Sequence, residues 1–418
     1  CIRMPDMYSK ELLEKYADVL IEKGVNIQKG QYLLLQCCID TLPLVRIICE
    51  KALLKGAKDV HVSISDPLIK KLRGKYLSQE QCAVVYDFEK EELDYFLRND
   101  CVQIGLMGTY PGLMDGVSDE NAMALAYAGN EVRNVIRKYI HDGTLQWTGT
   151  AYPTQDWANT VYPELSESDA LAQLEKDIAC MMRIDQDDPL KAWDDHCNRL
   201  RKVGDVLNQY QFQSLHLTSE LGTDLTVQLV ENHIWCSAAD MGEAKVKAKY
   251  IANMPTEEIF TDPHRDHVDG IAYASKPLMI NGKLVKDFWI RFENGIAVDC
   301  GAKENVEFLK DALFHDDRSR RLGEIALVSK KSPINQIGRL FYNGLIDENA
   351  ASHLAFGSSF PTNIENGTDM DEEELLKHGV NVASCHHDFM VGTEHYHVEG
   401  ITHDGKTVVI MDDGDFVL

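Results

Sequence analysis

The last third of the chain contains several short segments rich in histidine and carboxylate residues. Imidazole nitrogens and carboxylate oxygens together form the donor set that a pair of hydrolytic divalent metals requires. This part of the sequence therefore indicates a metal-dependent hydrolase, and most of the remaining chain is scaffold for it. In order, these segments are residues 253–258, 322–324, 347–353 and 386–388.

Taken one at a time, these segments have simpler explanations. If residues 386–388 form a strand, His386 and Asp388 face the same side, but a surface strand explains that pair equally well. His353 follows a run whose composition favours a helix, where a lone histidine is more often a packed or capping residue. Glu258 and Glu324 carry more weight, because each precedes apolar residues. A carboxylate with such neighbours is costly to bury unless it is paired or bound to metal.

Other kinds of site have little support. The patterns H-E-x-x-H, G-x-S-x-G and G-x-G-x-x-G do not occur, so a single-zinc helix, a serine elbow and a dinucleotide site are not indicated. Residues 400–407 match the phosphate-loop pattern in letters, but Asp404-Gly405 and the apolar run after it predict a β-hairpin. His395 and His397 could form a rival metal pair, although no carboxylate in an apolar segment accompanies them.

Composition narrows the class of protein. The chain has 418 residues with 42 Lys and Arg against 67 Asp and Glu, a formal charge of −25. This charge disfavours nucleic acids and anionic membranes as partners, and an acidic cleft would favour cationic substrates such as free peptide N-termini. The 11 cysteines are irregularly spaced without C-x-x-C, which predicts a reducing, cytoplasmic location. We expect neither a signal peptide nor a membrane-spanning segment.

The N-terminal half alternates predicted helices and strands. Such alternation is typical of β-α-β units and predicts an α/β domain with a largely parallel sheet. The predicted helices are residues 7–24, 42–54, 67–77, 89–97, 118–140 and 166–183, and the predicted strands are 31–39, 59–64 and 101–107.

The acidic segment 185–189, which ends in proline, is the best candidate for a domain boundary. We therefore expect an N-terminal domain over 1–185 and a C-terminal domain over 186–418. Short strands separated by Asn281-Gly282, Asn294-Gly295 and Asp404-Gly405 predict a mixed α+β domain with antiparallel hairpins. Its predicted strands are 215–218, 225–230, 278–280, 288–292 and 408–411, with helices at 304–313 and 345–356 and an acidic loop at 371–374.

Several segments in fixed order resemble the M29 family of metallo-aminopeptidases, the thermophilic-type aminopeptidases and their peptidase S relatives. The likeness extends over essentially the whole chain, more weakly in the N-terminal half, for example at 25–31. The segments that carry it are 253–261, 263–265, 320–328, 345–353 and 386–390.

The resemblance implies a metallo-aminopeptidase whose C-terminal domain holds two divalent metals. The implied ligands are Glu258, Glu324, His353, His386 and Asp388, with Glu257 as the alternative to its neighbour. Five side chains for two ions require at least one bridging carboxylate. A donor set of this kind admits zinc, cobalt, manganese or magnesium. The family also implies a homodimer and peptide substrates with a free N-terminus.

Two points concern catalysis itself. Glu348 or Glu257 is the expected carboxylate for moving a proton to the leaving amine. Phe360 stands seven residues after His353, where the family usually has a tyrosine, so an oxyanion donor is missing from that position. Two alternatives therefore stay open: a metal-dependent hydrolase of another amide or ester, and a weakly active or non-catalytic family member.

Overall fold

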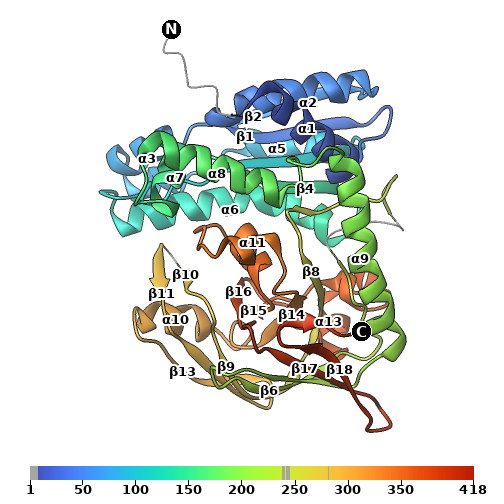
Figure 1. The fold of residues 1–418 in the computed structure, drawn as a ribbon. Coiled ribbons are helices and arrows are strands. Elements are labelled where there is room, and N and C mark those ends of the chain that lie inside the picture. Colours follow the sequence, from blue (N-terminus) through green and yellow to red (C-terminus); the bar gives the residue numbers. More distant parts are fainter. Residues whose placement is uncertain (1–7, 238–240, 242–244, 281) are drawn as a thin grey trace. The chain divides into compact units, whose positions relative to one another are not determined.

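The computed structural model describes residues 8–237, 241, 245–280 and 282–418 (Figure 1). The chain divides into two compact units, Cys1–Asp195 with Ala239–Met254 and His196–Ala238 with Pro255–Leu418. Helix α9 (Pro189–Tyr210) carries the chain from the first unit into the second. The predicted domain boundary at residue 185 stays a prediction. Within the described residues, no helix combines the length and the apolar character needed to cross a membrane.

The first unit is built on a parallel five-stranded sheet of order β2-β1-β3-β4-β7. The interior strand β1, between β2 and β3, is apolar and mostly buried, as expected for a parallel strand covered on both faces. The strands are β1 (Tyr32–Cys38), β2 (Asp59–Ser65), β3 (Cys101–Gly108), β4 (Gln146–Tyr152) and β7 (Asn253–Met254).

Helices cover both faces of this sheet, with α1 and α2 on one side and α6 on the other (Figure 1). Side-chain caps begin several of them; Ser118, for example, accepts a hydrogen bond from the Asn121 N–H at the start of α6. The helices are α1 (Lys10–Val19), α2 (Leu42–Leu54), α3 (Pro67–Tyr76), α4 (Gln79–Cys82), α5 (Asp87–Leu97), α6 (Asp119–His141), α7 (Gln155–Val161) and α8 (Glu167–Met181), with a π-helical turn at Leu20–Gly24.

The second unit contains two larger antiparallel sheets. Eight strands form the first, in the order β13-β12-β9-β6-β5-β17-β18-β19. They are β5 (Ser214–Thr218), β6 (Asp224–Leu229), β9 (Pro263–Tyr273), β12 (Trp289–Glu293), β13 (Ile296–Gly301), β17 (His397–Ile401), β18 (Thr407–Asp412) and β19 (Asp415–Phe416).

The other sheet has four antiparallel strands in the order β16-β15-β14-β8. β14 is buried along its whole length, as is β15. The strands are β8 (Glu258–Thr261), β14 (Leu322–Val328), β15 (His353–Gly357) and β16 (His386–Met390). A hairpin of β10 (Leu278–Ile280) and β11 (Lys283–Val285) and the helices α10 (Val306–Leu313), α11 (Pro333–Ile337), α12 (Gly344–Asp347) and α13 (Glu372–Lys377) complete the unit.

The predicted fold class is confirmed: one unit has a parallel α/β sheet and the other is α+β with antiparallel strands. The hairpin predicted at Asp404-Gly405 joins β17 to β18, and Asn294-Gly295 joins β12 to β13. The predicted turn at Asn281-Gly282 lies partly outside the described residues.

Two predictions of local structure were wrong. The predicted helix over 345–356 ends by Ala350, and residues 353–357 form β15 between two partner strands. Burial on both faces overrides the local helix propensity there. The predicted loop at 371–374 begins helix α13 instead, because Asp371 and Glu374 form a reciprocal capping box.

Candidate metal centre

The four-stranded sheet places the predicted donors on one face, beginning with Glu258, Glu324 and His353. Glu258 lies opposite Val328, and His353 lies opposite Ala326. Directly opposed residues in an antiparallel pair share a face, and so do alternate residues along a strand. Since Glu324, Ala326 and Val328 alternate along β14, all three donors point to the same side of the sheet.

The remaining two donors join that face through β16. Asp388 lies opposite Ala355, which in turn lies opposite Glu324. His386 precedes Asp388 by two residues and therefore faces the same side. Ala355 on the middle strand therefore lies between Glu324 and Asp388 in this row of the sheet.

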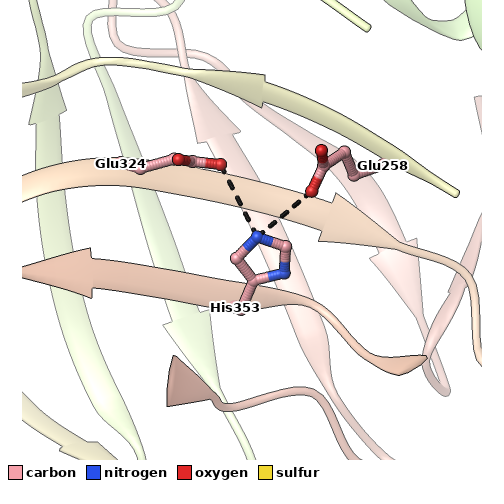
Figure 2. A group of neighbouring side chains, drawn as sticks. All are labelled: Glu258, Glu324 and His353. Carbon is pink, nitrogen blue, oxygen red and sulfur yellow. Dashed lines mark ion pairs between the residues drawn. The ribbon is translucent and has the colours of Figure 1, made fainter. Parts of the chain in front are cut away.

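The first donor group consists of Glu258, Glu324 and His353 (Figure 2). The Nε2 atom of His353 lies 3.2 Å from Oε2 of Glu258 and 3.5 Å from Oε1 of Glu324. Its other nitrogen, Nδ1, lies 3.2 Å from the carbonyl oxygen of Ala351. A carbonyl only accepts, so Nδ1 carries a proton, and the other nitrogen, Nε2, faces the two carboxylates.

The second group consists of Glu324, His386 and Asp388. The Nε2 atom of His386 is 3.1 Å from Oε2 of Glu324 and 3.1 Å from Oδ1 of Asp388. The Nδ1 atom donates to the carbonyl oxygen of Ser358 at 2.7 Å. The two histidines are thus held in the same way, each by a backbone carbonyl behind the ring.

Glu324 belongs to both groups, and each of its oxygens faces a different histidine. A β-bulge between Leu322 and Glu324 brings the carboxylate into register with its neighbours. Gly323 permits the bulge, because a Cβ on it would lie 2.4 Å from the Ser358 carbonyl oxygen. The glycine immediately before the shared carboxylate therefore has a steric role in the site.

The donor atoms fit divalent metal ions. In each group they lie within 4.8 Å of one another. Donors placed about 2.1 Å from a tetrahedral ion are about 3.4 Å apart, close to the separations between the imidazole and carboxylate atoms given above. Glu258 is 5% exposed, Glu324 4% and His353 1%, and buried carboxylates at this density are costly without cations.

The charges of these groups strongly perturb one another. Burial lowers the pKa of His353, but the carboxylates of Glu258 and Glu324 raise it more. The pKa of His353 is therefore well above its usual value. Burial opposes ionisation of Asp388, yet the neighbouring charge of His386 brings its pKa down to about 2. Burial raises the pKa of Glu258. The site thus holds concentrated negative charge that positive partners must balance.

The two other predicted carboxylates lie differently. Glu348 is half-buried in the 3₁₀ turn Glu348–Ala350. Its pKa is well above its usual value, mainly because of burial and also because of the negative charges of Asp388 and Glu258. Glu257 faces away from the donors: its Oε2 lies 3.7 Å from Nε2 of His196. Of the two adjacent glutamates, Glu258 is the one brought together with His353.

Phe360 packs directly on the donor group. Its ring meets that of His386 edge-on, with centroids 5.0 Å apart, and also contacts Phe260. Its backbone N–H donates to Oδ1 of buried Asp262 at 3.2 Å. Residue 360 therefore reaches the donor group, and its hydrocarbon ring carries no hydroxyl group.

Several residues that position the donors escaped the sequence reasoning. Asn349 accepts a hydrogen bond from the Glu257 N–H at 2.7 Å and so ties the turn that carries Glu348 to the start of β8. Ser358 acts only through its carbonyl, which no side-chain pattern reveals. The rival histidines stand apart: His395 pairs with Asp413, and His397 with Asp412 and Glu399.

Comparisons with known proteins identify the family to which the chain belongs. The family model of thermophilic metalloproteases (M29) matches residues 9–416. Aminopeptidase AmpS of Bacillus subtilis (strain 168) is 37% identical over 411 residues, 98% of this chain and 99% of that protein. Aminopeptidase T of Thermus aquaticus is 35% identical over 98% of this chain and 99% of its own length. The structure of wild-type AmpT from Thermus thermophilus aligns with a TM-score of 0.89 at 33% identity, covering 98% of this chain and 100% of that one. The chain therefore belongs to the M29 family of metalloproteases, whose members use divalent metal.

Proposed function

We propose that this protein is an aminopeptidase that hydrolyses the first peptide bond of short peptides with the help of two divalent metal ions. One observation carries the proposal: the carboxylate of Glu324 directs one oxygen toward His353 and the other toward His386. A carboxylate shared in this way is the natural bridge between two ions. The aminopeptidase names of the relatives at 35–37% identity support the substrate class.

The proposed ligands are Glu258, Glu324 and His353 for one ion and Glu324, His386 and Asp388 for the other. Divalent ions held there would lower the pKa of a coordinated water into the neutral range and polarise the scissile carbonyl. Zinc, cobalt, manganese and magnesium all suit a mixed set of imidazole and carboxylate donors. The identity of the ion is therefore part of the experiment.

The chain's own residues would bind and orient the substrate and move its proton. The carboxylates around the site create a negative field that attracts the ammonium group of a peptide's free N-terminus. Glu348 is the proposed proton carrier, since it adjoins the donor carboxylates without belonging to either donor group. It would take the proton of the attacking water and deliver it to the leaving amine. Glu257 is less suited, because its carboxylate faces His196.

The test is hydrolysis of Leu-p-nitroanilide with each added metal, after chelation, and in the Glu324→Gln variant. We expect metal-dependent activity that chelation abolishes and that the variant loses together with binding of both ions. Robust activity that resists chelation and survives the substitution would contradict the two-metal proposal.

A second candidate function is hydrolysis of another amide or ester at the same site. A panel of peptides with free and with acetylated N-termini distinguishes this function from aminopeptidase activity. An aminopeptidase cleaves only the free peptides. Equal rates on both series would favour the second function. A protein that binds metal yet cleaves neither series would be a non-catalytic family member, an outcome that Phe360 makes worth testing.

Finer aspects of the biology are also proposals. We propose that the protein is a homodimer, as the family resemblance implies, and sedimentation velocity would test this. We also propose that the boundary between the two domains lies at residue 185. We propose a cytoplasmic location, which is supported by the free thiols of the ten described cysteines, several of them buried. Fractionation of cells that produce the protein would test it.

A further inference from the structure

A cavity of about 300 Å³ lies in the second unit, beside the ends of β14 and β15. Val328, the last residue of β14, forms part of its wall, as does Ser352, which directly precedes His353. Ser352 joins the two strands there, since its hydroxyl accepts from the Val328 N–H at 3.0 Å. The volume is at the lower end of the range for small-molecule sites.

Three hydrogen-bond donors that line this cavity have no partner within the described parts of the chain. The Ser275 hydroxyl is buried and makes no hydrogen bond. Tyr396 is 1% exposed, and its hydroxyl makes none with the residues that the structure describes. Lys276 is half-buried and forms no ion pair with any described residue. Buried polar groups are seldom left unsatisfied, so the hydroxyl groups of Ser275 and Tyr396 in one cavity indicate a missing ligand.

The charge of Lys276 is the central feature. Burial lowers the pKa of its ammonium, and the carboxylate of Asp347 only partly opposes this effect. The oxygens of Asp347 already accept from the backbone N–H groups of Phe341 and Asn343, at 2.7 and 3.0 Å. Lys276 is therefore a half-buried cation without a contact counter-ion among the described residues.

The other charged residues of the wall are already paired. Lys330 contacts Glu394 at 3.2 Å, and Thr393 donates to Glu220 at 2.5 Å. Lys276 is therefore the charged residue of the wall that has no contact partner among the described residues, and it shares the cavity with the hydroxyl groups of Ser275 and Tyr396. An ammonium with two hydroxyl groups is suited to the oxygens of an anion.

We propose that this cavity binds a small anion that carries a carboxylate or phosphate group, held by Lys276, Ser275 and Tyr396. None of these three residues belongs to either donor group. Neither the peptide substrate nor the metals are needed for the proposal, so it stands or falls independently of the aminopeptidase activity.

The test is isothermal titration calorimetry with acetate and with inorganic phosphate at constant ionic strength, using acetamide as the uncharged control. The full chain is used with metal removed and with the Glu324→Gln substitution, so that anions bound at the metal centre do not contribute. We expect saturable binding of at least one anion and none of acetamide. The preferred anion distinguishes the carboxylate from the phosphate source.

Two variants locate the binding. Lys276→Met should weaken it by about 10- to 100-fold through loss of a charge-assisted contact, and Tyr396→Phe by about 2- to 10-fold through loss of one neutral donor. Lys283→Met, which alters an exposed lysine of β11, is the matched control and should bind as the parent does. The near-isosteric Tyr396→Phe change keeps the test valid if Lys276→Met unfolds. Two results would overturn the proposal. One is the absence of saturable binding, and the other is an anion affinity in both cavity variants that equals the affinity of the parent protein.

Discussion

Replacing Gly323 with alanine tests whether backbone geometry around Glu324 controls the metal centre. A Cβ at this position would lie 2.4 Å from the Ser358 carbonyl oxygen and 2.5 Å from that of Gly357, whereas ordinary contacts begin at 3.4 Å. The two backbones must therefore separate by about 1 Å, and overpacking of this kind typically destabilises a protein by about 1–3 kcal/mol.

The same displacement reaches a proposed ligand. The Ser358 carbonyl accepts the Nδ1–H of His386 at 2.7 Å. Hydrogen bonds of this type span only about 2.7–3.2 Å, so this one cannot absorb a shift of about 1 Å in either direction. His386 must then lose its hydrogen bond to the Ser358 carbonyl or move together with that carbonyl. Loss of a hydrogen bond that orients a metal ligand typically lowers metal affinity by about 10- to 100-fold.

The assay is competition with a chromophoric chelator for added metal, together with chemical unfolding of the metal-free protein. We expect Gly323→Ala to lose both metal affinity and stability. Gly129→Ala in α6 is the control, because its added Cβ meets nothing nearer than the Arg133 guanidinium at 3.8 Å, and it should be neutral or slightly stabilising. Unchanged metal affinity in Gly323→Ala would refute the link from the bulge to His386.

Three further substitutions have distinct expected results. Glu348→Gln should reduce kcat by about 10²- to 10⁴-fold with metal affinity nearly unchanged; parallel loss of metal binding would mean that Glu348 is a ligand. Phe360→Tyr should raise kcat by at least about tenfold, because it restores a donor beside His386, and an unchanged kcat would mean that another group serves the oxyanion. Burial lowers the pKa of His233 to about 4, so the unfolded state takes up the proton first as pH falls. His233 should therefore contribute about 3 kcal/mol of stability that is fully present above pH 6.5 and lost as pH falls to about 4. Comparing denaturant unfolding of the parent and His233→Asn over this range tests it, and identical pH dependence would contradict it.

Much of the first unit could be predicted from hydrophobic patterning. The run Leu33–Leu35 is buried on both faces, and such a run identifies a central parallel strand. β4 was not predicted, because its sequence contains Thr148, Gly149 and Thr150 and lacks both an apolar run and clean alternation. Its place is set by pairing with β3 and β7, which is information from distant parts of the chain.

At the metal centre, residue types could be predicted but the elements that carry them only in part. The segment Asp347–Ser352 has helical composition, and a helix does form near it, but His353 lies on a strand. Short apolar runs such as Leu354–Phe356 are ambiguous between a buried helix and a buried strand, and only the partner strands decide. The sequence likewise contains no sign that the carbonyl of Ser358 holds His386.

Strand register decides which carboxylates can act together. Glu257 and Glu258 are adjacent and chemically alike, yet at the start of β8 they face different partners, one His196 and the other His353. A slip of one residue in β8 would exchange them and bring the wrong carboxylate to the site. The bulge at Gly323 performs the equivalent adjustment for Glu324, and without it that carboxylate would turn to the apolar face of the sheet. The metal centre thus depends on two backbone alignments as much as on its five donors, which is why a change at a glycine without any donor atom should weaken metal binding.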